Sequence, residues 1–272
     1  MAGGQGGRRS GAAKPRGGWG RRNPSGARAA ARAGLSTPAA ENAGATPATA
    51  VPTTVPTPTP TLADRLRAET RELHAAAERA GVMRELLAGH LPLAGYVALL
   101  CSLQVIYTAL ERALDDRRSD PRIAPLRRPA LYRSAALTAD IAALQGADRA
   151  QALQPAAPAV AYGERIDRLA AAGSPALAAH AYVRYLGDLH GGQILATLVR
   201  RSFALGGAAG TAFYRFGDEV AVRSHRHALR QALATLPLTA AETDTVVVEA
   251  RWAFEQHVRL FDALAGATPT AS

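Results

Sequence analysis

Three glycines interrupt a stretch whose other residues follow the period of a helix. In residues 180–198 (HAYVRYLGDLHGGQILATL), Gly187, Gly191 and Gly192 fall within six positions, while apolar side chains recur near helical spacing. Each glycine in a helix interior costs about 0.5–1 kcal/mol relative to alanine. Something therefore requires bare backbone here, and three explanations are open: a kink, a close helix crossing, or a flat ligand lying against the main chain.

The rest of the chain after residue 60 is also patterned as helices. Thr61 and Asp64 match a capping box that opens the first helix, and Thr239 with Glu242 repeats this pattern near the end. Apolar periodicity and helix-ending residues predict further helices over residues 96–114, 129–144, 158–169, 174–205, 212–234 and 239–264. The helix with glycines at its middle should bend. No segment has the alternation of a strand, so we predict an all-α fold of about seven helices around one core.

The first 60 residues differ in composition from the remainder. They contain eight basic side chains against one acid, Glu41, and are rich in Gly, Ala, Pro and Thr. Such a segment cannot bury enough apolar surface to offset its ordering entropy. We therefore expect a disordered basic extension at 1–60, a helical domain at 61–265 and a short polar tail at 266–272. Seven of the ten net positive charges belong to the extension, so the high pI does not indicate nucleic-acid binding by the domain.

The sequence favours a cytoplasmic protein without a membrane anchor. The extension is rich in arginine and poor in acids, but it has few serines and no amphipathic period, so organellar import is the weaker alternative. It also has no apolar core of a secretory signal, and no run of 18 or more apolar residues occurs in the chain. A single cysteine, Cys101, suits a reducing compartment. We expect a monomer.

Several polar side chains lie at positions that suit a binding site. His74 borders the apolar face of the first helix, with Glu78 one turn later. It is either a satisfied boundary histidine or a metal ligand whose second nitrogen is oriented by an outer partner. Asp188 lies among the glycines, and Arg226 and Arg230 are one turn apart on a later helix. The arginines form either a solvated face or the edge of an anion site.

One ligand would account for all of these features. A large, flat, apolar dianion with a metal at its centre needs an axial histidine, bare backbone across the opposite face, and cations at its edge. That description fits haem. His74 would bind the iron on one side, and Gly187, Gly191 and Gly192 would let a kinked helix lie against the other.

Two separated motifs resemble those of the biliverdin-producing haem oxygenase family. HAYVRYLGDLHGGQIL (180–195) is similar to its signature helix, and LRAETRELHAAAE (66–78) resembles its first helix with the proximal histidine. The resemblance continues through SLQVIYTALE (102–111) to EARWAFEQHVRLFDAL (249–264). It therefore covers essentially all of the chain after the extension, and it implies an all-α domain that holds haem between a proximal and a kinked distal helix.

The resemblance also implies roles for individual residues. His74 matches the axial ligand of the haem iron, and Glu78 matches an acid near its outer nitrogen. Asp188 matches the aspartate of a distal water network that delivers a proton, beside Gly187 and Gly191 on the distal face. The positions implied near the propionates are Arg67, Tyr182, Arg226 and Arg230.

The activity that the resemblance implies is cleavage of haem at a meso carbon to biliverdin, carbon monoxide and ferrous iron. Haem b would be both cofactor and substrate, with O2 as the oxidant. The sequence has no flavin or nucleotide fingerprint, so electrons would come from a ferredoxin or a flavoprotein reductase. The alternative is a protein that stores or delivers haem without turnover, but storage does not need the carboxylate of Asp188.

One residue of the signature departs from the family pattern. His190 stands where the family usually has serine. It is either a substitution on the flank of the helix, a titratable group in the distal network, or a second axial ligand.

Overall fold

The computed structural model describes residues 60–145, 154–207 and 209–267, and the regular elements in these ranges are all helical. The predicted all-α fold is confirmed. The helices are α1 (Leu62–Glu78), α2 (Gly81–Ala88), α3 (Leu93–Asp116), η1 (Ala124–Leu126), η2 (Pro129–Leu131), α4 (Ser134–Gln145), α5 (Ala157–Ala171), α6 (Leu177–Ala181), η4 (Tyr182–Leu186), α7 (Gly187–Ser202), η5 (Ala212–Tyr214), α8 (Glu219–Ala234) and α9 (Ala240–Ala267). The predicted extension lies outside the described residues except for residue 60, and α9 continues two residues past the expected boundary at 265.

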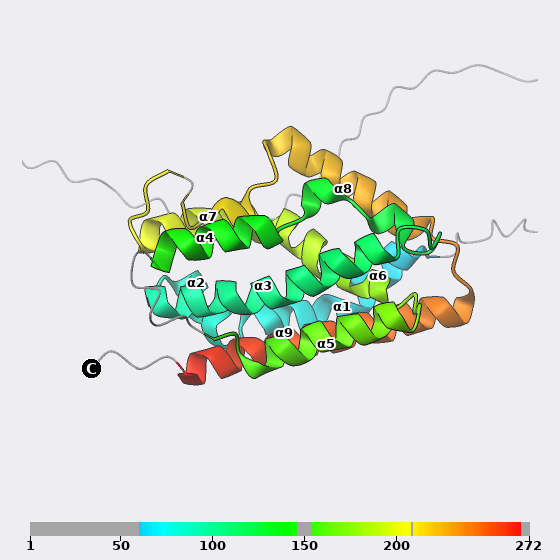
Figure 1. Cartoon of the computed structure of the whole chain (residues 1–272), viewed down its shortest axis with the longest axis horizontal. Helices are drawn as coiled ribbons and strands as arrows, with labels where there is room; N and C mark the ends of the chain where they lie inside the picture. Colours follow the sequence, from blue (N-terminus) through cyan, green and yellow to red (C-terminus); the bar gives the residue numbers. More distant parts are fainter. Residues whose placement is uncertain (1–59, 146–153, 208, 268–272) are drawn as a thin grey trace, which may run out of the picture. The chain divides into compact units, whose positions relative to one another are not determined.

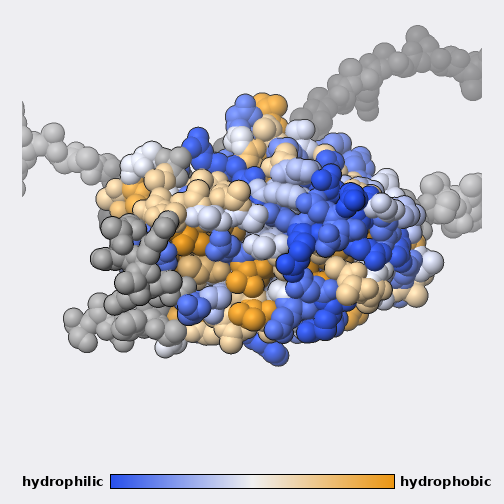
Figure 2. Space-filling model, in the orientation of Figure 1, coloured by the Kyte–Doolittle hydropathy of each residue, from blue (hydrophilic) through white to orange (hydrophobic). Residues whose placement is uncertain are grey.

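Helix α3 forms the centre of the core. Figure 1 shows α4 along one side of it, with α5 and α9 along the other. Helix α3 is the one described helix that is long and apolar enough to cross a membrane, but 67% of its most apolar window is buried inside the protein. It is therefore the core helix that its periodicity indicates. Figure 2 shows hydrophilic residues over the C-terminal half of α3 and more apolar surface toward its N-terminal half.

Both predicted capping boxes are present. The Thr61 hydroxyl accepts from the Asp64 backbone N–H at 3.2 Å, and the Asp64 carboxylate accepts from the Thr61 N–H at 3.2 Å. Thr239 and Glu242 make the same exchange at 3.2 and 2.9 Å. Caps of this kind contribute about 1 kcal/mol each, and they fix where α1 and α9 begin. These two helices pack against each other and carry one wall of the site.

Two predicted helices are each interrupted. The helix expected at 129–144 is divided into η2 and α4, because the buried Glu111 carboxylate of α3 accepts from the backbone N–H groups of Arg133 and Ser134 and so caps a new start. The helix expected at 212–234 is divided into η5 and α8. Gly217, at φ 97°, and the N-cap Asp218, which accepts from Ala221 at 2.8 Å, begin α8.

Helix α2 was not predicted from the sequence, because its eight residues are too few to show a period. Its first residue, Gly81, has φ 31°, and a side chain there would overlap the Phe261 backbone. Only glycine lets α2 begin so close to α9, and this approach closes one end of the site.

The helix expected at 174–205 bends, as predicted. The bend is the π-helix η4, which lies between α6 and α7 and ends immediately before Gly187. Figure 1 shows α6 and α7 running in different directions on either side of it. The π turn places Arg184 and the residues of α7 above the core.

Candidate functional site

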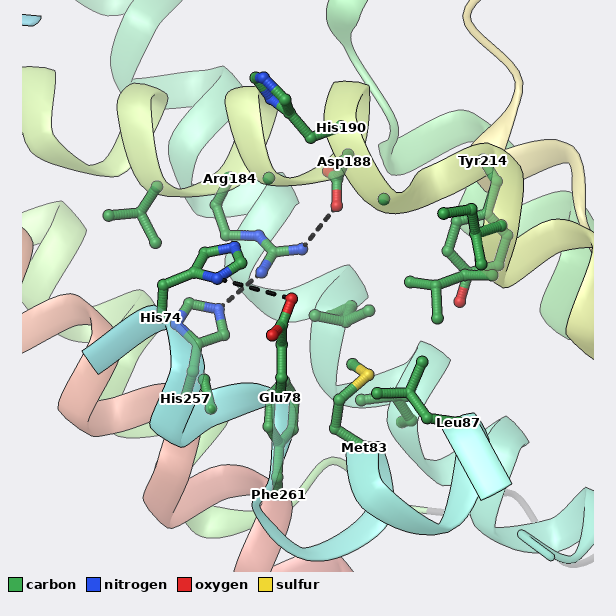
Figure 3. A pocket seen from close by; sticks show the side chains of 18 of the residues that line it. His74, Glu78, Met83, Leu87, Arg184, Asp188, His190, Tyr214, His257 and Phe261 are labelled. Atoms are coloured by element: carbon green, nitrogen blue, oxygen red, sulfur yellow. Dashed lines mark hydrogen bonds and ion pairs between the residues drawn. The ribbon is translucent and has the colours of Figure 1, made fainter. Parts of the chain in front are cut away.

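A cavity of about 330 Å³ lies beneath α7, within the range typical of ligand pockets. Its walls come from α1, α2, α3, η4, η5 and α9, so most of the fold contributes to it (Figure 3). The lining is mainly apolar. The ionisable side chains among the lining residues are His74, Glu78, Arg184, Asp188, His190, Tyr214 and His257.

His74 reaches the cavity from α1. Its ring packs edge-on against Phe254, with centroids 5.7 Å apart, and its Nδ1 lies 3.6 Å from a Glu78 carboxylate oxygen (Figure 3). The other ring nitrogen, Nε2, has no hydrogen-bond partner among the described residues. Glu78 can therefore orient the imidazole while Nε2 is available to a ligand in the cavity.

The described residues contain no group of three or more His, Cys, Asp or Glu that could hold a metal ion. A bare ion would thus find only one good ligand at His74. A metal bound here would have to bring most of its ligands with it, as the iron of haem does. The donor set of the cavity therefore fits haem better than a free ion.

The glycines of α7 have two different surroundings. A Cβ atom added to Gly187 or Gly191 would meet nothing within 4 Å, and both residues line the cavity. A Cβ on Gly192 would lie 3.4 Å from the carbonyl oxygen of Tyr214. Gly192 thus permits close packing against η5 and does not line the cavity, whereas Gly187 and Gly191 leave bare backbone facing open space. That bare surface is where a flat ligand could lie.

Asp188 is held by a closed set of hydrogen bonds. Arg184 donates through Nη2 to one Asp188 oxygen at 3.2 Å and through Nε to the Tyr107 hydroxyl at 3.2 Å. The Tyr107 hydroxyl donates to the other Asp188 oxygen. The third contact of Arg184 is from Nη1 to Nε2 of His257, at 2.7 Å. Figure 3 shows Asp188 and Arg184 pointing from the same side into the cavity.

Burial shifts the pKa of both members of the Asp188–Arg184 ion pair. It raises the pKa of the Asp188 carboxyl well above its usual range, because the carboxylate loses solvent. It lowers the pKa of Arg184 to about 10, so the guanidinium keeps its charge at neutral pH. The 3.2 Å ion pair opposes protonation of Asp188 while burial favours it. Burial thus makes this carboxylate a stronger base than that of an exposed aspartate.

The predicted edge residues gather outside the cavity lining. The Tyr182 hydroxyl lies 3.3 Å from the Thr70 hydroxyl. Burial raises the pKa of Tyr182, and the positive charges of Arg230 and Arg67 oppose that shift. The charges of Arg226 and Arg230 also lower the pKa of His190, where they act in the same direction as burial. Arg67, Arg226 and Arg230 form no ion pair with any described residue, so three unpaired cations lie along one edge of the site.

His190 lies on the flank of α7. Its Nδ1 is 2.6 Å from the Leu186 carbonyl oxygen, so this nitrogen carries a proton and donates it. Burial and the neighbouring arginines lower the pKa of His190, against the effect of that hydrogen bond. Figure 3 shows the ring directed away from Asp188 and His74. This placement corresponds to the flank substitution among the three sequence interpretations.

Three residues of the hydrogen-bonded group around Asp188 were not singled out from the sequence: Tyr107, Arg184 and His257. Tyr107 fits the apolar stripe of its helix, which conceals its hydroxyl. Arg184 could have been found from its i, i+4 spacing to Asp188. His257 could have been noticed as a polar residue between Phe254 and Phe261 on a buried face.

Known proteins resemble this chain along nearly all of the described part. The sequence pattern of the family described as "Heme oxygenase" matches residues 60–263. Heme oxygenase 1 of Synechocystis is 33% identical over 205 residues, covering 75% of this chain and 85% of the relative. Human heme oxygenase 1 is 34% identical over 206 residues, covering 75% and 71%.

Solved structures of heme oxygenases are also similar to this chain. The crystal structure of Synechocystis heme oxygenase-1 in complex with heme has a TM-score of 0.71 and 33% identity, covering 76% of this chain and 93% of that one. The crystal structure of Synechocystis heme oxygenase-2 in complex with heme and NO has a TM-score of 0.72 and 34% identity, covering 75% and 85%.

Proposed function

The chain belongs to the haem oxygenase family and is an enzyme that converts haem to biliverdin, and we propose that it does so in the cavity beneath α7. The reaction cleaves haem at a meso carbon and releases carbon monoxide and ferrous iron. The observation that carries the assignment to this cavity is that Asp188 and Arg184, both bonded to Tyr107, line the same space as His74.

His74 would hold the haem iron through Nε2. Glu78 would orient the ring through Nδ1, at the 3.6 Å separation described above. Gly187 and Gly191 would contact the opposite face of the haem, since their bare backbone leaves room for a flat ring. Bound haem supplies the redox-active iron and also the porphyrin that is cleaved.

Asp188 would carry the proton that the reaction consumes. Its two oxygens are held by Tyr107 and Arg184, and burial favours protonation of its carboxyl. A water molecule between Asp188 and the haem would pass the proton on. Arg184 would keep the carboxylate directed into the cavity and limit the cost of burying it.

The unpaired cations would fix the orientation of haem. Arg67, Arg226 and Arg230 would pair with the two propionates, and Tyr182 lies at the same edge. Because these contacts decide which meso carbon lies over the distal side, they would set the isomer of biliverdin produced.

We propose O2 as the oxidant and a ferredoxin or flavoprotein reductase as the source of electrons. We further propose that the protein is a cytoplasmic monomer. We also propose that it binds no nucleic acid, because the domain retains only three of the chain's ten net positive charges.

Turnover by the reconstituted protein tests the assignment. Purified protein is loaded with haem, a reductant is added in air, and the Soret band is followed together with the absorbance of biliverdin. We expect the Soret band to disappear as biliverdin forms, and His74→Ala to abolish stable binding. A Soret band that persists in the loaded wild-type protein would instead indicate haem storage or delivery.

A further inference from the structure

His257 is a buried histidine of α9 that no role described above requires. Only 3% of its surface is exposed. Its Nδ1 lies 2.7 Å from the Ala253 carbonyl oxygen, and its Nε2 lies 2.7 Å from Nη1 of Arg184. Because a carbonyl oxygen can only accept, Nδ1 must carry a proton. Because a guanidinium can only donate, Nε2 must be the bare acceptor. These two contacts fix the tautomer of the ring.

The imidazole must also be neutral. Burial, together with the charge of Arg184, lowers the pKa of His257 to about 3. A protonated ring would direct an N–H group at the guanidinium and remove its acceptor. The contact between His257 and Arg184 therefore exists in one protonation state only.

Arg184 has few alternative acceptors. It is buried, and each of its three nitrogens uses a different partner: Tyr107, Asp188 and His257. A buried guanidinium without an acceptor on one side turns toward those that remain. Figure 3 shows His257 and Asp188 on opposite sides of the guanidinium, so loss of the His257 acceptor would release Arg184 on the side away from the carboxylate.

The ring of His257 is itself held in place. Tyr162 packs edge-on against it at 5.2 Å and Phe261 at 5.8 Å. The Tyr162 hydroxyl lies 3.0 Å from Nδ1 of His180, and Nε2 of His180 lies 3.2 Å from Glu249. This support connects α5, α6 and α9, so the position of the acceptor is fixed by the packed core.

We infer that His257 is a positioning residue of the haem-degrading reaction. As a neutral acceptor it holds Arg184, and through Arg184 it holds Asp188 in the geometry that delivers the proton. The inference rests on the proposed role of Asp188.

The first experiment uses the haem-free protein. The ¹⁵N signals of the histidine side chains, recorded by NMR between pH 8 and pH 5, report the tautomer of His257. We expect a neutral ring protonated at Nδ1 throughout this range. A charged ring, or a ring protonated at Nε2, would overturn the inference whether or not the protein degrades haem.

The second experiment compares two substitutions. His257→Leu keeps an apolar side chain but removes the acceptor, whereas His257→Gln supplies an oxygen that can accept from Arg184. We expect His257→Leu to lower kcat by about tenfold or more, with haem affinity nearly unchanged. His257→Gln should restore most of the rate. The pH at which the spectrum of the ferric haem complex undergoes its alkaline transition should shift in the Leu variant and return in the Gln variant.

Two results would contradict a positioning role. One is equal loss of kcat in both variants, which would indicate that the shape of the ring matters and its acceptor does not. The other is an unchanged kcat and alkaline transition in His257→Leu. If wild-type protein binds haem without degrading it, the proposed function fails, while the NMR measurement still decides how His257 contacts Arg184. That measurement needs no variant, so misfolding of His257→Leu would not prevent the test.

Discussion

The Tyr107 hydroxyl of α3 donates a hydrogen bond to the carboxylate of Asp188 on α7, across 81 positions of sequence. Arg184 binds both groups, so the core helix and the helix above the cavity share one polar contact. The proposed proton carrier is thereby tied to the most deeply buried part of the fold. The position of the Asp188 carboxylate should therefore be insensitive to motion of residues at the protein surface.

We expect Asp188→Asn to separate binding from turnover. The amide matches the size of the carboxyl but cannot take up or release a proton at neutral pH. Haem affinity should stay close to that of the wild type, while the rate of Soret decay should fall by about 100-fold or more. Tyr107→Phe is the matched comparison, because it removes one hydrogen bond to Asp188 and keeps the carboxyl, and its loss should be smaller. Equal rates for Asp188→Asn and wild type would exclude Asp188 as the proton carrier.

We expect Gly191→Ala to change stability and binding in opposite directions. The added methyl group meets nothing within 4 Å in the haem-free protein, and alanine is favoured in helices by about 0.5–1 kcal/mol. The free energy of unfolding without haem should therefore rise. The methyl group would lie where the haem face should be, so haem affinity should fall. Urea unfolding and haem titration measure the two effects.

Gly266→Ala is the control for that substitution. Gly266 also has open space at its Cβ position, but it lies near the end of α9 and away from the cavity. It should leave haem affinity unchanged. If Gly191→Ala binds haem as tightly as Gly266→Ala does, the backbone of Gly191 is not a contact surface for haem.

We expect Arg226→Ala and Arg230→Ala each to weaken haem binding by about tenfold, as for loss of a charge-assisted hydrogen bond. The effect should diminish at high salt. Both variants should also give a mixture of biliverdin isomers, which chromatography can resolve. Arg223→Ala is the control, since Arg223 lies on the same helix and pairs with Glu219 at 2.5 Å. A single isomer and unchanged affinity in both variants would place the propionates elsewhere.

We expect the haem-free protein to lose stability as the pH falls below about 6.5. His257 titrates near 6.5 when exposed and near 3 in the folded chain, so between these values the unfolded chain binds the additional proton. The folded state therefore loses about 1.4 kcal/mol per pH unit from this residue. Burial shifts the pKa of His180 in the same direction.

Urea unfolding at pH 7 and pH 5 measures this dependence. Between pH 7 and pH 5, His257→Gln should lose less stability than the wild type by about 2 kcal/mol, because the slope of about 1.4 kcal/mol per pH unit applies only below pH 6.5. Parallel slopes for the two proteins would show that His257 does not titrate on unfolding in this range.

The sequence predicted those parts of the fold that local interactions determine. Thr61 with Asp64 and Thr239 with Glu242 begin helices because their contacts span only three residues. The break before α4 could not be predicted in this way, because the capping carboxylate of Glu111 comes from α3. The break before α8 had local signals in Gly217 and Asp218 that the apolar pattern outweighed.

The same distinction applies to the site. His74, Asp188 and the glycines lie in motifs that can be read along the chain, and five of the predicted site residues line the cavity: His74, Glu78, Gly187, Asp188 and Gly191. Tyr107 and His257 join Asp188 through contacts between distant helices, and a buried tyrosine or histidine looks like any other core residue until its partner is known. The roles of the predicted residues remain predictions that the variants above test.

The π-helix η4 sets the phase of α7. A π turn contains one residue more than an α turn, so an uninterrupted α-helix with the same residues would complete that turn one residue earlier. All that follows would then rotate by about 100° around the helix axis. Gly187 and Gly191 would turn away from the cavity together, and Asp188 would leave both Tyr107 and Arg184. Deleting one residue of η4 other than Arg184 should therefore restore an ordinary α-helix and leave Gly187, Asp188 and Gly191 still directed toward the cavity.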